Sequence, residues 1–216
     1  MANTCLQLTG FLVSLLGWVG LIIATATNEW VVTCKYGMNT CKKMDELGSK
    51  GLWAECVIST ALYHCISLNQ ILELPAYIQT SRALMITASM LGLPAAALLL
   101  VSMPCVNLGG EGQSAKNKQA LLGGALTLIV ALCGIISTVW FPIGAHQEQA
   151  LMSFGFSLYA GWVGAAFSLL GGCMIVCCSL ESPAPYADSG RFYYSKHGQS
   201  NPTSPSSTNH AKSAHV

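Results

Sequence analysis

The sequence predicts a helical membrane protein in which four spanning helices carry a small extracellular β-sheet and a disordered cytoplasmic tail. Of the 216 residues, 52% are hydrophobic and only 9% are charged, whereas soluble domains carry about 25% charged residues. The 10 Lys and Arg and the 9 Asp and Glu residues all lie outside four runs, 1–28, 83–110, 119–147 and 149–180. Each run exceeds the roughly 20 apolar residues that a helix needs to cross a bilayer.

The four spans are expected at residues 6–25, 83–103, 119–141 and 156–178. A four-span domain would then cover residues 1–180, with outer loops at 28–82 and 142–155 and a cytoplasmic loop at 104–118. Residues 181–216 are rich in Ser, Pro, Gly and Asn and have no apolar period, so we expect a disordered tail. Because the spans contain no Asp, Glu, Lys or Arg, they lack the ionisable groups typical of pumps and transporters.

The first run has an alternative interpretation as a cleaved secretory leader, because Ala24-Thr25-Ala26 resembles a signal-peptidase site. A leader has a basic start and an apolar core of about 7–15 residues. Here the apolar stretch from Cys5 to Ala26 is longer, and no Lys or Arg precedes it. We therefore favour a spanning helix, which leaves both termini on one side of the membrane.

The cysteines indicate on which side of the membrane the termini lie. The distribution of basic residues does not indicate it, since five Lys or Arg lie in 28–82 and five lie on the opposite side. The 28–82 loop holds four cysteines, Cys34, Cys41, Cys56 and Cys65, and an even number in one short segment is typical of an oxidising exterior. We expect this loop outside and both termini in the cytoplasm.

Small residues recur at helical spacing on three of the spans. They are Gly10, Gly17 and Ala24; Gly123, Thr127 and Ala131; and Gly164, Ser168 and Gly172. Such faces allow helix backbones to approach closely. Packing within the bundle is the favoured interpretation, and a dimerisation face is the alternative.

The first outer loop has the composition of short strands. Residues 30–34 are rich in β-branched and aromatic side chains, and 51–58 with 62–66 have the pattern of a hairpin. Bridging Cys56 to Cys65 would stabilise so small a sheet by roughly 2.5–3 kcal/mol in the loop-closure model. Four cysteines allow three pairings, of which we favour 56 with 65 and 34 with 41. A zinc site is the rival, but the spacings do not match a zinc finger.

The loop also carries a family signature. Trp30, Gly51-Leu52-Trp53, Cys56 and Cys65 resemble the W-GLW-C-C motif of the claudins, which are tight-junction membrane proteins. Arg82, at the start of the second span, also resembles the family, and the match runs through all four spans. Residues 45–50, the second cysteine pair and the C-terminal end are similar to one subgroup in particular.

The resemblance implies a left-handed four-helix bundle whose two outer loops form one five-stranded sheet. It implies partners of the same kind, since claudins polymerise side by side in one membrane and meet strands of the opposing cell. Ile71 falls where the family presents an apolar lateral contact; packing onto its own domain or into lipid headgroups is the alternative. No cofactor is implied.

The resemblance also bears on ion selectivity. Cation-pore members carry an acidic residue just after the second signature cysteine, whereas Cys65 is followed by Ile66-Ser67-Leu68. The loop is also formally neutral, with five basic residues (Lys35, Lys42, Lys43, Lys50, Arg82) against five acidic ones (Glu29, Asp45, Glu46, Glu55, Glu73). We therefore expect a paracellular seal with weak charge selectivity.

Two features of the cytoplasmic side suggest attachments. Cys105, Cys177 and Cys178 are juxtamembrane and suited to S-palmitoylation, with free thiols as the alternative. The chain ends in His215-Val216, and PDZ domains capture an apolar C-terminal residue by β-augmentation.

Three other functions are disfavoured. A net charge of +1 without a basic stripe offers little to a nucleic acid. An enzyme would need a nucleophile and a base, and His64 beside Cys65 is the only superficial candidate. A regulatory subunit of a channel or receptor shares the four-span pattern, but many such proteins carry an N-glycosylation sequon, which this chain lacks.

Overall fold

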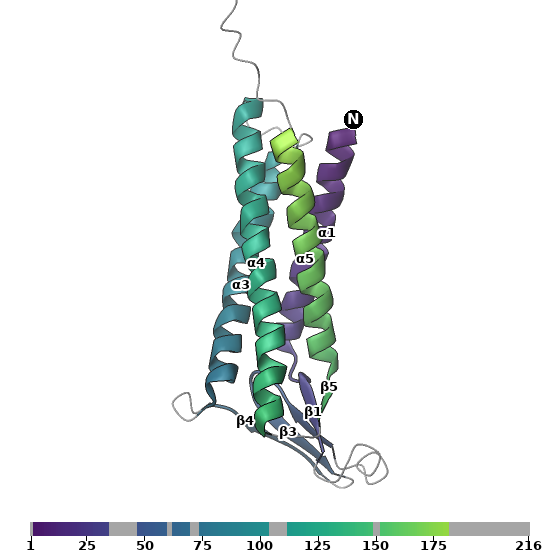
Figure 1. The fold of residues 1–216 in the computed structure, drawn as a ribbon, viewed down its shortest axis with the longest axis vertical. Helices are drawn as coiled ribbons and strands as arrows, with labels where there is room; N and C mark the ends of the chain where they lie inside the picture. Colours follow the sequence, from purple (N-terminus) through teal and green to yellow (C-terminus); the bar gives the residue numbers. More distant parts are fainter. Residues whose placement is uncertain are drawn as a thin grey trace, which may run out of the picture. The chain divides into compact units, whose positions relative to one another are not determined.

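The computed structural model describes residues 2–34, 47–59, 62–69, 74–103, 112–148 and 152–181. These residues form four long helices that lie side by side, with a small sheet at the end away from the N-terminus (Figure 1). The helices are α1 (Ala2–Ala26), α3 (Ala76–Ser102), α4 (Gln113–Glu148) and α5 (Phe156–Glu181). Each is long and apolar enough to cross a membrane. The predicted disordered tail beyond 181 and most of the 104–118 loop lie outside the described residues.

The sheet has five antiparallel strands in the order β4-β3-β2-β1-β5. They are β1 (Val31–Thr33), β2 (Leu47–Lys50), β3 (Ala54–Ser59), β4 (Leu62–Ser67) and β5 (Met152–Phe154). The predicted hairpin is β3 and β4, and the five-stranded sheet implied by the family resemblance is confirmed. Because Val31 pairs with Phe154, the two segments that were predicted as separate outer loops contribute to one sheet.

Helix α4 continues beyond the predicted end of its span. Pro142 lies inside it, although proline lacks the N–H that a helix interior needs and usually ends or bends a helix. The carbonyl group deprived of that donor is four residues earlier, at Thr138. Trp162 Nε1 donates to this oxygen at 3.4 Å, so α5 supplies the missing partner, and α4 reaches Glu148 at the sheet.

Small residues hold the helices together, as expected. The backbone of Gly17 on α1 lies against Gly164 and Ser168 on α5, where an added Cβ would overlap Ser168. Helices α3 and α4 are joined by reciprocal hydrogen bonds, because Ser81 Oγ donates to the Ser137 carbonyl at 3.4 Å and Ser137 Oγ donates to the Ser81 carbonyl at 3.2 Å. The small-residue faces thus serve packing within the bundle.

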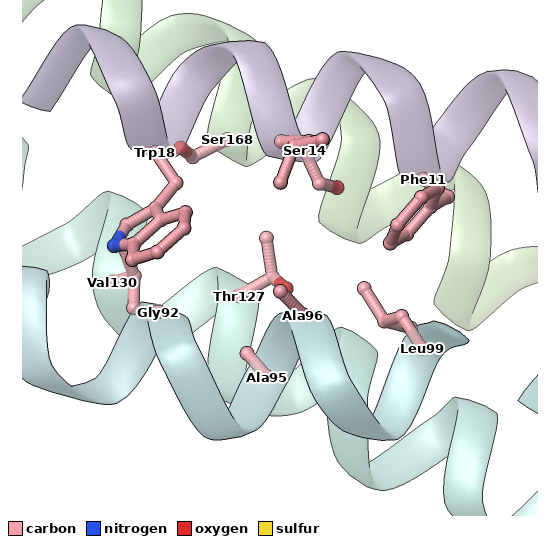
Figure 2. A pocket seen from close by; sticks show the side chains of 11 residues that line it. Phe11, Ser14, Trp18, Gly92, Ala95, Ala96, Leu99, Thr127, Val130 and Ser168 are labelled. Carbon is pink, nitrogen blue, oxygen red and sulfur yellow. The ribbon is translucent and has the colours of Figure 1, made fainter. Parts of the chain in front are cut away.

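Helices α1 and α3 meet at Trp18. Its indole lies on Gly92, where an added Cβ would overlap the ring, and its Nε1 donates to the Ser89 carbonyl at 3.0 Å. Figure 2 shows the narrow cavity beside this contact, with Phe11 and Trp18 of α1 lying across from Ala95 of α3. Pro94 lies inside α3, and the helix continues past it.

The main core of buried side chains lies where the sheet joins the bundle. Its largest fully buried members include Trp30, Phe141, Leu52, Ile78 and Leu158. By contrast, large apolar side chains on the outer surfaces of the helices are exposed in the isolated chain, among them Leu12, Leu16, Met90, Leu93 and Val163. This distribution is that of a helix bundle whose outer surface faces lipid.

Candidate functional site: the sheet and its attachment to the helices

A disulfide joins Cys56 to Cys65. The two residues lie opposite each other in the register of β3 and β4, and Tyr63 Oη donates to Cys56 Sγ at 3.6 Å. The predicted pairing is therefore confirmed, and neither sulfur remains available to a metal. Cys34 is also in a disulfide; Cys41 lies outside the described residues, so the pairing of 34 with 41 stays a prediction.

Trp30, which directly precedes β1, packs into the helix bundle and attaches the strand to it. Its side chain is fully buried, and its Nε1 donates to the Ala24 carbonyl near the end of α1 at 2.9 Å. The centroid of its ring lies 4.9 Å from that of Phe141 on α4. A buried indole needs both apolar contacts and an acceptor for its N–H, and Trp30 obtains them from two helices.

The Gly51-Leu52-Trp53 segment is held at the end of α1. Gly51 lies so close to the backbone of Asn28 that any Cβ would overlap it, and Leu52 is fully buried. Trp53 Nε1 donates to the Thr25 carbonyl at 2.6 Å, and the Trp53 backbone N–H donates to Asn28 Oδ1 at 3.2 Å. Strand β3 therefore begins at Ala54, three residues later than the sequence pattern indicated.

Arg82 links α3 to the open end of the hairpin, where β3 begins and β4 ends. Its Nε donates to the Leu52 carbonyl and its Nη2 donates to the Leu68 carbonyl at 3.0 Å. The guanidinium also lies 5.2 Å from the centroid of the Trp53 ring, within reach of a cation–π interaction. All the signature residues thus belong to one contact network that attaches the disulfide-braced hairpin to α1 and α3.

A second attachment was not predicted from the sequence. Lys50 Nζ on β2 lies 2.6 Å from Glu148 Oε2 at the end of α4, and Tyr77 Oη on α3 donates to the same oxygen at 2.8 Å. Burial by itself lowers the pKa of Lys50, but the hydrogen bonds and charges of Glu148 and Tyr77 outweigh it, and the pKa is raised. Lys50 and Glu148 are 98 residues apart, so sequence spacing carried no signal of the pair.

The comparisons with known proteins agree with this geometry. Residues 4–175 match the PMP-22/EMP/MP20/Claudin family. The chain belongs to this family and is a claudin. It is 56% identical to mouse claudin-11 and 54% identical to human claudin-11, in each case over 216 residues and 100% of both chains. It is 35% identical to mouse claudin-7 over 202 residues, which are 86% of this chain and 92% of the relative.

One face of the β3–β4 hairpin in this claudin carries exposed apolar side chains. In the register, Glu55 lies opposite Ile66, Val57 opposite His64 and Ser59 opposite Leu62. Because side chains alternate along a strand, Val57, Leu62 and Ile66 share this face, and all three are more than half exposed. Strand β4 also lies at one edge of the sheet.

The remaining predicted site residues stand as follows. Cys177 is exposed and Cys178 is buried near the end of α5. Ile71, Cys105, His215 and Val216 lie outside the described residues. Among the residues that are described, no three His, Cys, Asp or Glu side chains are close enough to hold a metal ion.

Proposed function

We propose that this claudin polymerises with other claudins in the same membrane and across to the opposing cell, and that it seals the paracellular space. The observation that carries this proposal is the five-stranded sheet itself. It is braced by Cys56–Cys65, attached to the bundle by Trp30, Trp53 and Arg82, and has β4 at an edge. An edge strand with apolar neighbours is suited to pairing with another chain.

The sheet lies outside the cell in this proposal, with both termini in the cytoplasm. The disulfide between Cys56 and Cys65 supports this orientation, because such bonds persist in oxidising surroundings and are rare in the cytosol. Four apolar helices of spanning length make the chain a multi-pass membrane protein, and its similarity to claudin-11 supports the plasma membrane as its location.

The seal is weakly selective for charge. Ile66 follows the second signature cysteine and shares its exposed face with Val57 and Leu62. The carboxylate of Glu55, opposite Ile66, lies beside the ammonium-bearing Lys50 in the register of the next strand, so this face carries one charge of each sign and no net charge to attract cations. Sodium and chloride would therefore be excluded to similar extents.

Expression in a leaky epithelial monolayer tests the proposal. Transepithelial resistance should rise while the sodium-to-chloride permeability ratio changes little. Ile66→Asp should raise that ratio, whereas Ser67→Asp, on the other face of the same strand, should leave it near the wild-type value. A wild-type protein that raised sodium permeability steeply over chloride would contradict the proposed seal.

Ile71 is proposed as an apolar contact to the neighbouring copy. The variant Ile71→Glu would place a charge in that contact and should reduce strand formation in cells without other claudins. Normal strands on freeze fracture would refute this role.

Two cytoplasmic attachments complete the proposal. Cys105, Cys177 and Cys178 anchor the chain through palmitoyl groups, with the exposed Cys177 more accessible than the buried Cys178. Replacing all three with Ser should abolish labelling by palmitate; retained labelling would argue against these sites. His215-Val216 binds the PDZ domain of a scaffold protein. Deleting Val216 should release the scaffold and leave strand formation intact.

A further inference from the structure

We infer that Lys50, Glu148 and Tyr77 form a positioning clamp that sets the orientation of the sheet on the bundle, and thereby decides whether the sheets of neighbouring copies align. This inference rests on the proposed polymerisation. It assigns a role to three side chains that lie outside the W-GLW-C-C network.

The clamp acts on the middle of the sheet. In the strand order β4-β3-β2-β1-β5, the strand that carries Lys50 is the central one. Trp30 attaches the neighbouring strand β1 to the bundle, and Arg82 attaches the open end of the β3–β4 hairpin. The salt bridge Lys50–Glu148 ties this central strand to α4.

Tyr77 makes the contact rigid. Its ring lies edge-on to Phe141, with centroids 5.5 Å apart, and Phe141 in turn contacts Trp30. Gly144 lies beneath the same ring, where an added Cβ would overlap it. The extension of α4 past Pro142 makes this arrangement possible, because it brings Gly144 against Tyr77 of α3 and Glu148 to Lys50 of the sheet.

The two partners of the ion pair are unequally exposed. The Lys50 side chain is only 13% exposed, whereas that of Glu148 is 40% exposed. Removing Glu148 would leave a largely buried ammonium without its carboxylate, which is costly. Removing Lys50 would leave a carboxylate that water can still reach, which costs less. The clamp thus predicts that Glu148→Gln is more harmful than Lys50→Met.

The test compares four variants in fibroblasts that lack tight junctions: Glu148→Gln, Lys50→Met, Glu55→Gln, and the charge swap Lys50→Glu with Glu148→Lys. The swap is made together with Glu55→Gln, so that the new carboxylate at position 50 does not lie opposite a second one. Glu55 is the matched control, since it faces Lys50 in the register of the next strand. Surface biotinylation reports delivery to the membrane, mobility without reductant reports the disulfide, and freeze fracture reports strand continuity.

We expect Glu148→Gln to lose continuous strands, Lys50→Met to lose fewer, and the swap and Glu55→Gln to form strands like the wild type. Normal strands with Glu148→Gln, or greater damage from Lys50→Met, would overturn the clamp. If Glu148→Gln is retained inside the cell, the charge-swap variant provides the test. Surface delivery and continuous strands in the swap variant support the clamp, and their absence from the swap variant refutes it. A wild-type chain that forms no strands would instead refute the proposed polymerisation.

Discussion

The guanidinium of Arg82 lies 5.2 Å from the centre of the Trp53 ring while two of its nitrogens donate to the carbonyl oxygens of Leu52 and Leu68, which flank the open end of the hairpin. One side chain on α3 therefore holds both the signature tryptophan and the backbone that flanks the disulfide. This explains why an arginine accompanies the loop motif, since only a planar group with several fixed donors can make these contacts together.

Replacing Arg82 with Met should lower the free energy of unfolding by about 2–3 kcal/mol, because two charge-assisted hydrogen bonds are lost and their acceptors are left in a partly buried site. Thermal unfolding of the purified protein in detergent would measure the change. Lys118→Met is the control, since Lys118 is exposed at the far end of α4. Equal melting temperatures for the two variants would contradict the assigned role of Arg82.

Gly51→Ala should destabilise the sheet by about 1–3 kcal/mol, because the new methyl group would meet the backbone of Asn28, which cannot move aside without shifting the end of α1. The same substitution at Gly112 has no atom within 4 Å of the new Cβ. We expect reduced surface delivery for the first variant and wild-type delivery for the second. Equal delivery of both would show that the close approach at Gly51 is unimportant.

Gly92→Ala should also be harmful, although alanine is the better helix former by about 1 kcal/mol. The reason is the Trp18 indole, which an added Cβ would overlap. A smaller partner should relieve the clash, so Gly92→Ala should cost less in a Trp18→Leu background than in the wild type. Melting temperatures of the four proteins in this cycle measure the coupling; strict additivity would argue against the contact.

Replacing both Cys56 and Cys65 with Ser should lower the free energy of unfolding by roughly 2.5–3 kcal/mol, because the unfolded chain regains the conformational entropy that the bond removes by closing the loop. The expected result is a melting temperature below that of the oxidised wild type. Reductant should no longer lower it by breaking the Cys56–Cys65 bond, because that bond is absent. A double variant as stable as the oxidised wild type would mean that the hairpin does not need its disulfide.

Much of the bundle was predictable, because charge segregation marks apolar spans directly. The end of α4 was not. Pro142 is an ordinary signal for the end of a helix, and only the donor on Trp162, twenty residues later in the chain, satisfies the carbonyl group that proline leaves unpaired. A hydrogen bond from another helix to that carbonyl group cannot be recognised from the residues around Pro142.

The sheet was predictable where composition favours strands and obscure elsewhere. The β3–β4 hairpin contains Val57, Ile58 and Ile66, whereas β2 contains Gly48 and Ser49, which are not typical of strands. Strand β2 forms because both of its neighbours supply hydrogen-bonding partners. Similarly, the Lys50–Glu148 pair exists only once α4 extends beyond Pro142, so it could not be found before the fold was known.

Freeze-fracture microscopy of junction-free fibroblasts expressing the wild-type chain tests the central claim most directly. If a disulfide-braced, helix-anchored sheet lets neighbouring copies assemble, the replicas should contain continuous branching strands where cells touch. Dispersed particles without strands, from cells with the protein at the surface and Cys56 bonded to Cys65, would contradict it.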